Sequence, residues 1–252
     1  MRKYLICFIT TFIFYQGFTQ EKILIDNITI VGNKITKETI ILREITFKKG
    51  DFLSQTEIDI KTKQSKENLV NLNLYNFVDI SSENSGGETN IIIEVVERWY
   101  IWPYPILELS ERNFNVWWDE FKESKYSDFS RMNYGVYLVW ENFRGKNQLL
   151  KLKYRRGFKE HYLFRYEIPY FNKEKTIGIS AFAQHFRRKK SFYNTMDNKL
   201  LYYENGDKYT TKDSEFQITI LYRKNTRNKH KLRLNYLQSN IADSIKSYNP
   251  DY

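Results

Sequence analysis

Cysteine is almost absent from this sequence. The single one, Cys7, lies in the apolar stretch at the start of the chain, and no lipobox surrounds it. A mature chain that begins at Gln20 would therefore have neither a disulfide nor a thiolate metal site. After this start, no stretch is apolar enough to cross a membrane as a helix, which needs about 20 residues. Any later membrane segment would have to be a strand of a β-barrel.

Familiar catalytic motifs are missing as well. The sequence contains no G-x-S-x-G motif, no Walker loop and no H-E-x-x-H motif. The three histidines, His161, His185 and His230, match no metal-binding spacing. The carboxylates are scattered, and no pair of them can be placed together. We therefore expect no enzymatic activity, no catalytic, cofactor-binding or metal-binding residues, and no cofactor.

Aromatic residues and basic charge are abundant. Aromatics make up 17% of the chain, with 20 tyrosines, although the mean hydropathy is −0.62. Tyrosine joins an apolar ring to a polar tip, which suits a surface between apolar and polar surroundings. Residues 99–252 carry 28 basic and 17 acidic residues, a net charge of +11. Such an excess is typical of partners with negative charge, an anionic membrane or nucleic acid, and also of a solvated surface.

The first twenty residues have the pattern of a secretory signal. Arg2 and Lys3 precede the mostly apolar segment Tyr4–Tyr15. Gly17 and Thr19 are small residues at positions −3 and −1 of a cut before Gln20. The pattern predicts a signal peptide over residues 1–19 and export from the cytoplasm, with a short membrane anchor as the alternative.

Residues 20–98 read as a small α+β domain. The expected elements are a strand at Ile23–Val31, a helix at Lys37–Arg43 capped by Thr36, a second helix behind the capping box Ser54–Glu57, and strands at Phe77–Ser82 and Thr89–Glu97. Their order is β-α-α-β-β. The last strand is apolar on both faces, which predicts a central position in the sheet.

Several stretches of this domain resemble the polypeptide-transport-associated (POTRA) domain. They are Ile28–Glu44, the Gly50-Asp51 turn, Leu74–Ile80 and Ile91–Glu97. The resemblance covers the domain end to end. It implies a periplasmic domain that precedes a 16-stranded outer-membrane barrel of the BamA/TamA type. In that family such domains are thought to hold unfolded client chains by strand addition to a sheet edge.

The resemblance also suggests which strand would accept a client. The predicted strand that contains Phe77, Val78, Asp79, Ile80 and Ser81 would lie at an edge of the sheet and offer unpaired amides and carbonyls. We expect this edge to bind client strands. The alternative is a rigid spacer that binds nothing.

Residues 99–252 show a clear period of two. The alternating segments are Met132–Glu141, Gln148–Arg155, Tyr162–Ile168, Thr176–His185, Glu215–Arg223 and Leu232–Tyr236, to which we add a first strand near Tyr100–Leu109. Short connections alternate with the long ones at Glu111–Arg131 and Arg187–Asp213, apart from a short exception at Gly157–Glu160. This pattern favours the N-terminal portion of an antiparallel transmembrane β-barrel over a soluble sandwich.

Three barrel segments also resemble the start of the barrel in the same family, namely Tyr100–Pro105, Arg112–Asn115 and Asn142–Gly145. The late-barrel Arg-Gly motif of the family is not matched. About seven strands are expected, whereas a closed barrel of this kind needs an even number of at least eight. We therefore expect an incomplete barrel, from the N-terminal part of a longer protein or from a truncated gene product.

Two groups of barrel residues carry functional hypotheses. Pro103 and Pro105 interrupt the first barrel strand, and proline cannot donate to a strand ladder. In the resembled family the first and last strands meet at a seam that opens sideways, and the prolines would weaken it; alternatively they only end the linker. The basic run Arg187, Arg188, Lys189 and Lys190 would contact outer-leaflet glycolipid phosphates, with a plain solvated loop as the alternative.

The resemblance implies an outer-membrane assembly, insertion or translocation factor without enzymatic activity. Its POTRA domain would capture client strands and its barrel seam would pass them to the membrane. The alternatives are a two-partner secretion translocator, a barrel fused to a hydrolase encoded beyond this sequence, and a fragment that never inserts. The expected partners are outer-membrane lipid, unfolded outer-membrane or secreted clients, and periplasmic or lipoprotein accessory subunits, but no nucleic acid.

Overall fold

The computed structural model describes residues 22–110, 113–206, 208–224 and 228–250, so the predicted signal peptide lies outside the described residues. The chain divides into two compact units, of which the first ends at Arg98 and the second begins at Trp99. Among the described residues, no helix is both long enough and apolar enough to span a membrane.

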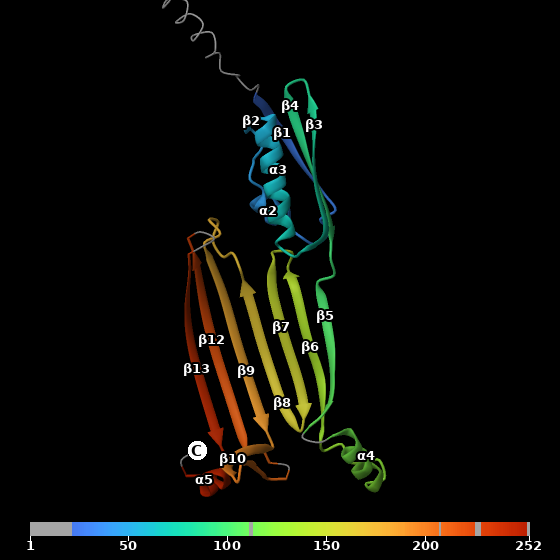
Figure 1. The fold of residues 1–252 in the computed structure, drawn as a ribbon, viewed down its shortest axis with the longest axis vertical. Coiled ribbons are helices and arrows are strands. Elements are labelled where there is room, and N and C mark those ends of the chain that lie inside the picture. The colour runs from blue at the N-terminus through green and yellow to red at the C-terminus, as the bar shows by residue number, and fades with distance from the viewer. Residues whose placement is uncertain (1–21, 111–112, 207, 225–227, 251–252) are drawn as a thin grey trace, which may run out of the picture. The chain divides into compact units, whose positions relative to one another are not determined.

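The first unit is a four-stranded sheet with two helices (Figure 1). Its elements are β1 (Lys22–Val31), α2 (Glu38–Glu44), β2 (Phe52–Ser54), α3 (Gln55–Val70), β3 (Tyr75–Ser85) and β4 (Glu88–Glu97). The strand order is β2-β1-β4-β3, with β1 parallel to β4 and the other neighbours antiparallel. All five expected elements are present. The three-residue strand β2, which the sequence pattern did not indicate, pairs with the start of β1.

The core of this unit lies between the helices and one face of the sheet. Ile41 of α2 and Ile58 and Leu69 of α3 are buried against Ile91 and Ile93 of β4. The predicted central position of β4 is confirmed, since it lies between β1 and β3. Its second face is less covered than the double apolar pattern indicated. Val96, for example, is 53% exposed.

The two helices begin in different ways. The capping box of α3 is confirmed: the Glu57 amide donates to Ser54 Oγ at 3.4 Å, and the Ser54 amide donates to Glu57 Oε2 at 2.8 Å. The expected Thr36 cap of α2 is wrong, because the helix begins one residue later and Lys37 at its N-cap makes no side-chain cap bond. Thr36 is buried, and its amide donates to Glu97 Oε1 at 2.5 Å.

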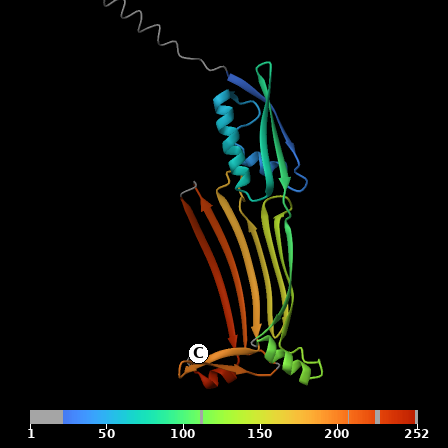
Figure 2. The ribbon, with the colours of Figure 1, turned by 45° about the vertical axis from the view of Figure 1, so that its right-hand side comes forward.

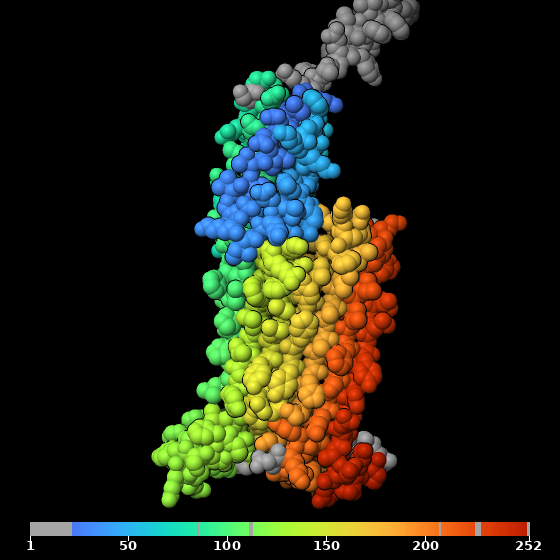
Figure 3. Space-filling model, turned by 180° about the vertical axis from the view of Figure 1, so that it is seen from behind, coloured from blue at the N-terminus to red at the C-terminus, as the bar shows by residue number. Residues whose placement is uncertain are grey.

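The second unit contains a seven-stranded antiparallel sheet. Its strands are β5 (Ile101–Leu109), β6 (Met132–Phe143), β7 (Gln148–Gly157), β8 (Lys159–Ile168), β9 (Ile177–Arg188), β12 (Thr211–Arg223) and β13 (Lys229–Ile241). The order β13-β12-β9-β8-β7-β6-β5 follows the chain, so each strand pairs with its sequence neighbours in this set. The strands follow one another in colour from green to red across the space-filling view (Figure 3). The expectation of about seven strands is confirmed.

The connections differ between the two ends of this sheet. At the linker end, where β5 begins near Ile101, the strands are joined by the short segments 144–147, 169–176 and 224–228. At the far end, where β5 ends near Leu109, the long connections fold into elements of their own (Figure 2). These are the helix α4 (Phe114–Glu123), the hairpin β10 (Lys190–Met196) and β11 (Lys199–Glu204), and the helix α5 (Asp243–Tyr248). The sequence pattern indicated only loops there.

Candidate functional site

The strand β3 forms one edge of the first sheet. It pairs with β4, with Val78 opposite Val95 and Ile80 opposite Ile93, and with no second strand among the described residues. Successive residues of a strand direct their backbone groups to alternate sides, so about half of the β3 amides and carbonyls lie along the open edge. The edge position expected for Phe77–Ser81 is therefore confirmed, whereas client binding stays a prediction.

The side chains along β3 fall into two sets. Val78 and Ile80 are buried in the core with residues of α3. Phe77 is 55% exposed. Asp79 accepts a hydrogen bond from Lys66 Nζ of α3 at 2.8 Å, and this contact lowers the pKa of the Asp79 carboxyl. A strand that pairs with β3 would approach both the exposed ring and the ion pair.

The strand β5 forms an edge of the second sheet, and its hydrogen bonds show which of its residues face that edge. The Tyr100 carbonyl accepts from the Glu141 amide at 2.8 Å, and the Ser110 amide donates to the Arg131 carbonyl at 3.0 Å. The register between β5 and β6 is unbroken. Even-numbered residues of β5 therefore direct their backbone groups to β6. Pro103 and Pro105 are odd-numbered and direct theirs to the open edge.

This geometry corrects the expectation that Pro103 and Pro105 interrupt the first barrel strand. The strand runs continuously from Ile101 to Leu109, with Pro103 opposite Leu138 and Pro105 opposite Val136. The physical reason is that a proline lacks only its own amide donor. Because that donor would point away from β6, the β5–β6 ladder loses no hydrogen bond. The prolines also lie inside the strand, so they do not end a linker.

The basic run does not form a single patch. Arg187 lies against buried Glu160 and stacks 4.6 Å from the centre of the Tyr209 ring. Arg188, on the opposite face of β9, donates to Asp213 at 2.8 Å. Lys190 lies 4.9 Å from the centre of the Tyr202 ring, and Lys189 lines a hollow beside Glu204. Burial, followed by a hydrogen bond to Glu160, raises the pKa of Tyr209 to about 12.

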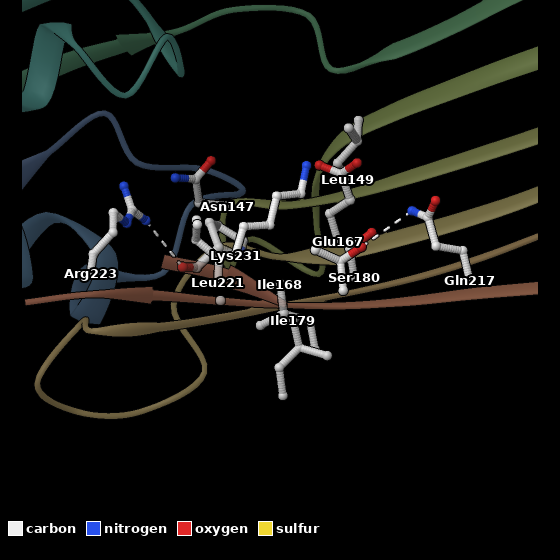
Figure 4. A pocket seen from close by; sticks show the side chains of 13 residues that line it. Asn147, Leu149, Glu167, Ile168, Ile179, Ser180, Gln217, Leu221, Arg223 and Lys231 are labelled. Atoms are coloured by element: carbon white, nitrogen blue, oxygen red, sulfur yellow. Dashed lines mark hydrogen bonds between the residues drawn. The ribbon is translucent and has the colours of Figure 1, made fainter. Parts of the chain in front are cut away.

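The seven-stranded sheet has one polar and one apolar face. Figure 4 shows a hollow of about 440 Å³ on the polar face, where Glu167, Ser180 and Gln217 come from β8, β9 and β12. Ile168 and Ile179 point to the other side of the sheet (Figure 4). The Arg223 guanidinium closes the linker end of the hollow by donating to the Pro169 carbonyl at 3.3 Å. The alternation read from the sequence is thus confirmed.

Large apolar side chains are exposed on the other face. They include Val136, Leu152, Phe164, Phe216, Ile218, Ile220, Leu232, Leu234 and Tyr236, of which the last is 60% exposed. Contiguous apolar patches of this extent are rare on soluble monomers. This face therefore requires an apolar environment.

An aromatic cluster at the far end was not found by the sequence pattern. Trp117 of α4 stacks on Phe121 with ring centres 4.8 Å apart, and Phe114 stacks on Trp118 at 6.0 Å. The Asn113 side chain caps this helix by accepting from the Val116 amide at 2.9 Å. The signal in the sequence is the helical spacing of Phe114, Trp117, Trp118 and Phe121 behind an asparagine.

The described residues contain no group of three or more histidine, cysteine, aspartate or glutamate side chains that could hold a metal ion. The histidines lie on separate strands. His161 bonds Gln184 at 3.0 Å, His185 bonds Ser214 at 2.8 Å, and His230 stacks on Tyr222. Each histidine thus has a partner within the sheet.

A family model for POTRA domains, described as "surface antigen variable number repeat", matches residues 23–98. Among solved structures, the chain resembles BamA from Haemophilus ducreyi lacking POTRA domains 1–3, with a TM-score of 0.55 and 18% identity over 86% of this chain and 36% of that one. CdiB from Acinetobacter baumannii gives a TM-score of 0.44 and 15% identity over 88% of this chain and 39% of that one. CdiB from Escherichia coli gives 0.42 and 12%, over 86% and 38%.

The chain thus spans less than two fifths of each of these structures. No curated protein matches its sequence. The POTRA match and the likeness to BamA agree with the two units described above. Residues 23–98 therefore form a POTRA domain, and the chain has the fold of a BamA-type protein in which such a domain precedes the antiparallel strands of a β-barrel.

Proposed function

We propose that this chain belongs to an exported outer-membrane factor that inserts or translocates other proteins. The observation that carries the proposal is the direct connection of two parts. A POTRA domain with an open β3 edge leads into a sheet that exposes one apolar face and keeps a polar one. The POTRA domain would bind a client strand, and the sheet would anchor the protein in the membrane.

The membrane position follows from the chemistry of the two faces. A β-barrel in lipid needs an apolar outer band and a polar interior. Phe216 and Ile218 on the exposed face, and Gln217 and Thr219 on the other, meet these needs within a single strand. Short connections at the linker end and long ones at the far end, apart from the single residue Phe158 between β7 and β8, are typical of periplasmic and external ends. The POTRA domain then lies in the periplasm.

Client capture is proposed for the backbone of β3. An extended client segment would hydrogen-bond the open amides and carbonyls of Phe77–Ser81 and continue the sheet. Backbone pairing is independent of client sequence, so one edge serves many clients. The exposed Phe77 ring would add an apolar contact for alternate client side chains.

The proposed seam is the open edge of β5. Pro103 and Pro105 remove two amide donors from this edge while the β5–β6 ladder stays intact. A strand that closes against β5 would therefore lack two hydrogen bonds, each worth about 1 kcal/mol. The weakness is confined to the edge that must open for a client strand to enter the membrane.

The proposal is tested with a photo-reactive amino acid placed at Phe77 in cells that express the protein. Crosslinks to unfolded outer-membrane or secreted chains are expected from this position. Ile60, which is 64% exposed on the outer side of α3, serves as the matched control and should give none. Equal yields from the two positions, or no client from either, would contradict client capture at β3.

The identity of the crosslinked chains separates the two variants of this function. An assembly factor captures many different barrel proteins, whereas a two-partner secretion translocator captures one dedicated secreted chain. Periplasmic or lipoprotein accessory subunits would appear as additional crosslinks from other exposed positions of the POTRA domain. The proposal keeps the expectation of a factor without enzymatic activity.

A further inference from the structure

Charged side chains form a row across the apolar face of the second sheet, close to its far end. Arg156, Glu160, Arg187 and Lys212 come from β7, β8, β9 and β12 in that order, and the pairs Glu160–Arg187 and Arg187–Lys212 lie in register. Glu160 is only 4% exposed and contacts both arginines, Arg156 Nε at 3.5 Å. The row thus holds one carboxylate and three cations, so it keeps a net charge of about +2.

The neighbouring row toward the linker end is made of aromatic side chains with polar tips. Tyr154, Tyr162 and His185 lie in register on β7, β8 and β9, with ring centres 5.5 and 6.5 Å apart. The Tyr162 hydroxyl points to the charged row and donates to Glu160 Oε2 at 3.4 Å. Amphipathic rings of this kind are favoured where apolar and polar surroundings meet.

The third row contains a groove. Ala183 of β9 lies in register between Phe164 of β8 and Phe216 of β12. Because the alanine is flanked by two large rings, the surface dips over it. The resulting hollow measures about 600 Å³, and Leu152 and Val136 extend its apolar lining across β7 and β6.

We propose that these three rows form a binding site for a phosphorylated glycolipid of the outer leaflet. The phosphate lies on Arg156, Arg187 and Lys212, and one acyl chain lies in the groove over Ala183. The order from charged row to amphipathic row to apolar groove repeats the order of phosphate, glycerol or sugar region and acyl chain in such a lipid. The planar guanidinium of arginine can donate two hydrogen bonds to phosphate oxygens, so it matches phosphate in geometry as well as in charge.

The position of the site along the strands indicates which membrane leaflet supplies the lipid. The charged row lies at the far end of the sheet, opposite the end that connects to the POTRA domain. If that domain is periplasmic, as proposed above, the row lies at the level of the outer leaflet, and this inference rests on that membrane position. The site keeps only Arg187 from the basic run Arg187–Lys190 and adds Arg156 and Lys212 from other strands.

The test measures lipid retention by the complete protein. The protein is reconstituted in phosphatidylcholine nanodiscs that contain a few per cent of diphosphorylated, hexa-acylated lipid A, and is then moved to detergent. Native mass spectrometry is expected to show lipid A retained on the protein. A parallel sample with phosphatidylglycerol in place of lipid A should show at least tenfold less retention.

Three variants and two matched controls locate the site. Arg156→Gln and Lys212→Gln should each weaken retention about tenfold, because each removes a charge-assisted phosphate contact. Ala183→Leu should abolish retention by filling the groove. Ala181→Leu changes the same strand and face two residues away, and Arg165→Gln removes a cation from the polar face. Both controls should retain lipid A like the unchanged protein.

The outcomes that overturn the inference are distinct from failure of the proposed function. Equal retention of lipid A and phosphatidylglycerol, equal effects of the two leucine substitutions, or no retention by an inserted protein would each refute the glycolipid site while leaving the membrane position intact. A protein that does not insert into the nanodisc at all would refute the membrane position, and with it both proposals.

Discussion

Single residues at the start of α3 make the stability of the POTRA domain depend on pH. The hydrogen bond from the Ser54 amide, and then the Ser54 hydroxyl, lower the pKa of Glu57 below its usual 4.5. A lowered pKa means that the charged carboxyl stabilises the folded domain above pH 4.5, and that this contribution is lost as pH falls through the folded pKa. The capping box therefore loses its contribution to the stability of the domain in acid.

We expect Glu57→Gln to reduce the acid sensitivity of this domain. Urea unfolding at pH 7 and at pH 3 should show a smaller fall in unfolding free energy for the variant than for the unchanged protein. Ser54→Ala should cost about 1 kcal/mol at pH 7, because it removes the other half of the cap. An unchanged pH profile in Glu57→Gln would show that the capping carboxylate contributes nothing.

The Lys66–Asp79 ion pair bears on strand addition at β3. Both side chains are nearly half exposed, 45% and 46%, so solvent screens the pair and it contributes little to stability. It nevertheless joins α3 to the edge strand, where an arriving strand would displace it. We predict that Lys66→Ala raises the affinity for an extended client peptide two- to threefold, measured by fluorescence anisotropy.

Lys63→Ala, on an exposed position of the same helix, is the matched control and should leave the affinity unchanged. A weaker affinity for Lys66→Ala than for this control would indicate that Lys66 contacts the client instead of guarding the edge.

Side-chain contacts at helix ends could be predicted from the sequence where the two interacting residues lie close together in the chain. The Ser54–Glu57 box could be predicted because its two members lie three residues apart. The expected Thr36 cap failed because Glu97, 61 residues along the chain, binds the Thr36 amide. The split of Arg187 and Arg188 to opposite faces was not predicted, because β9 continues past His185 to Arg188 and the partners Glu160 and Asp213 lie far away in sequence.

At the scale of elements, most strands of both units follow from periodicity, whereas the three-residue strand β2 and the far-end elements do not. A period of two identified six of the seven strands of the second sheet, because one face is apolar and the other polar, and the first strand near Tyr100–Leu109 was added to them. The helix α4 has aromatic residues at helical spacing, a signal that the strand pattern did not include. The hairpin β10–β11 is held by backbone pairing and by ring contacts, such as Phe192 against Tyr202 at 6.3 Å, which periodicity does not reveal.

The direction of the missing amides in β5 gives a prediction for this element. Replacing both Pro103 and Pro105 with valine adds two donors to the open edge. In the full-length protein the seam should then open less often, and client insertion should slow. Disulfide crosslinking across the seam, together with the rate of client insertion, measures this change.

Ile106→Val is the control for the proline variants, because residue 106 directs its backbone groups to β6. It should leave both readouts unchanged. Seam opening that is equally frequent with and without the prolines would count against the proposed weakness of this edge.

At the scale of the whole molecule, charge and polarity divide the two units. Residues 21–98 carry a net charge of −3 and residues 99–252 one of +11. The order of the units and the POTRA domain were predictable from the sequence, because each unit has a period or motif order of its own. The charged row around Glu160 was not predictable, because it joins four strands and depends on their register.

The central claim is that the seven-stranded sheet spans a bilayer with its apolar face in lipid. The only cysteine is Cys7, so single cysteines can be introduced along β12 after Cys7→Ser and carry spin labels. Labels at Phe216, Ile218 and Ile220 of the membrane-reconstituted protein should be accessible to oxygen and shielded from a water-soluble nickel chelate. Labels at Gln217 and Thr219 should show the reverse. Accessibility to the chelate at all five positions, without alternation, would contradict the account.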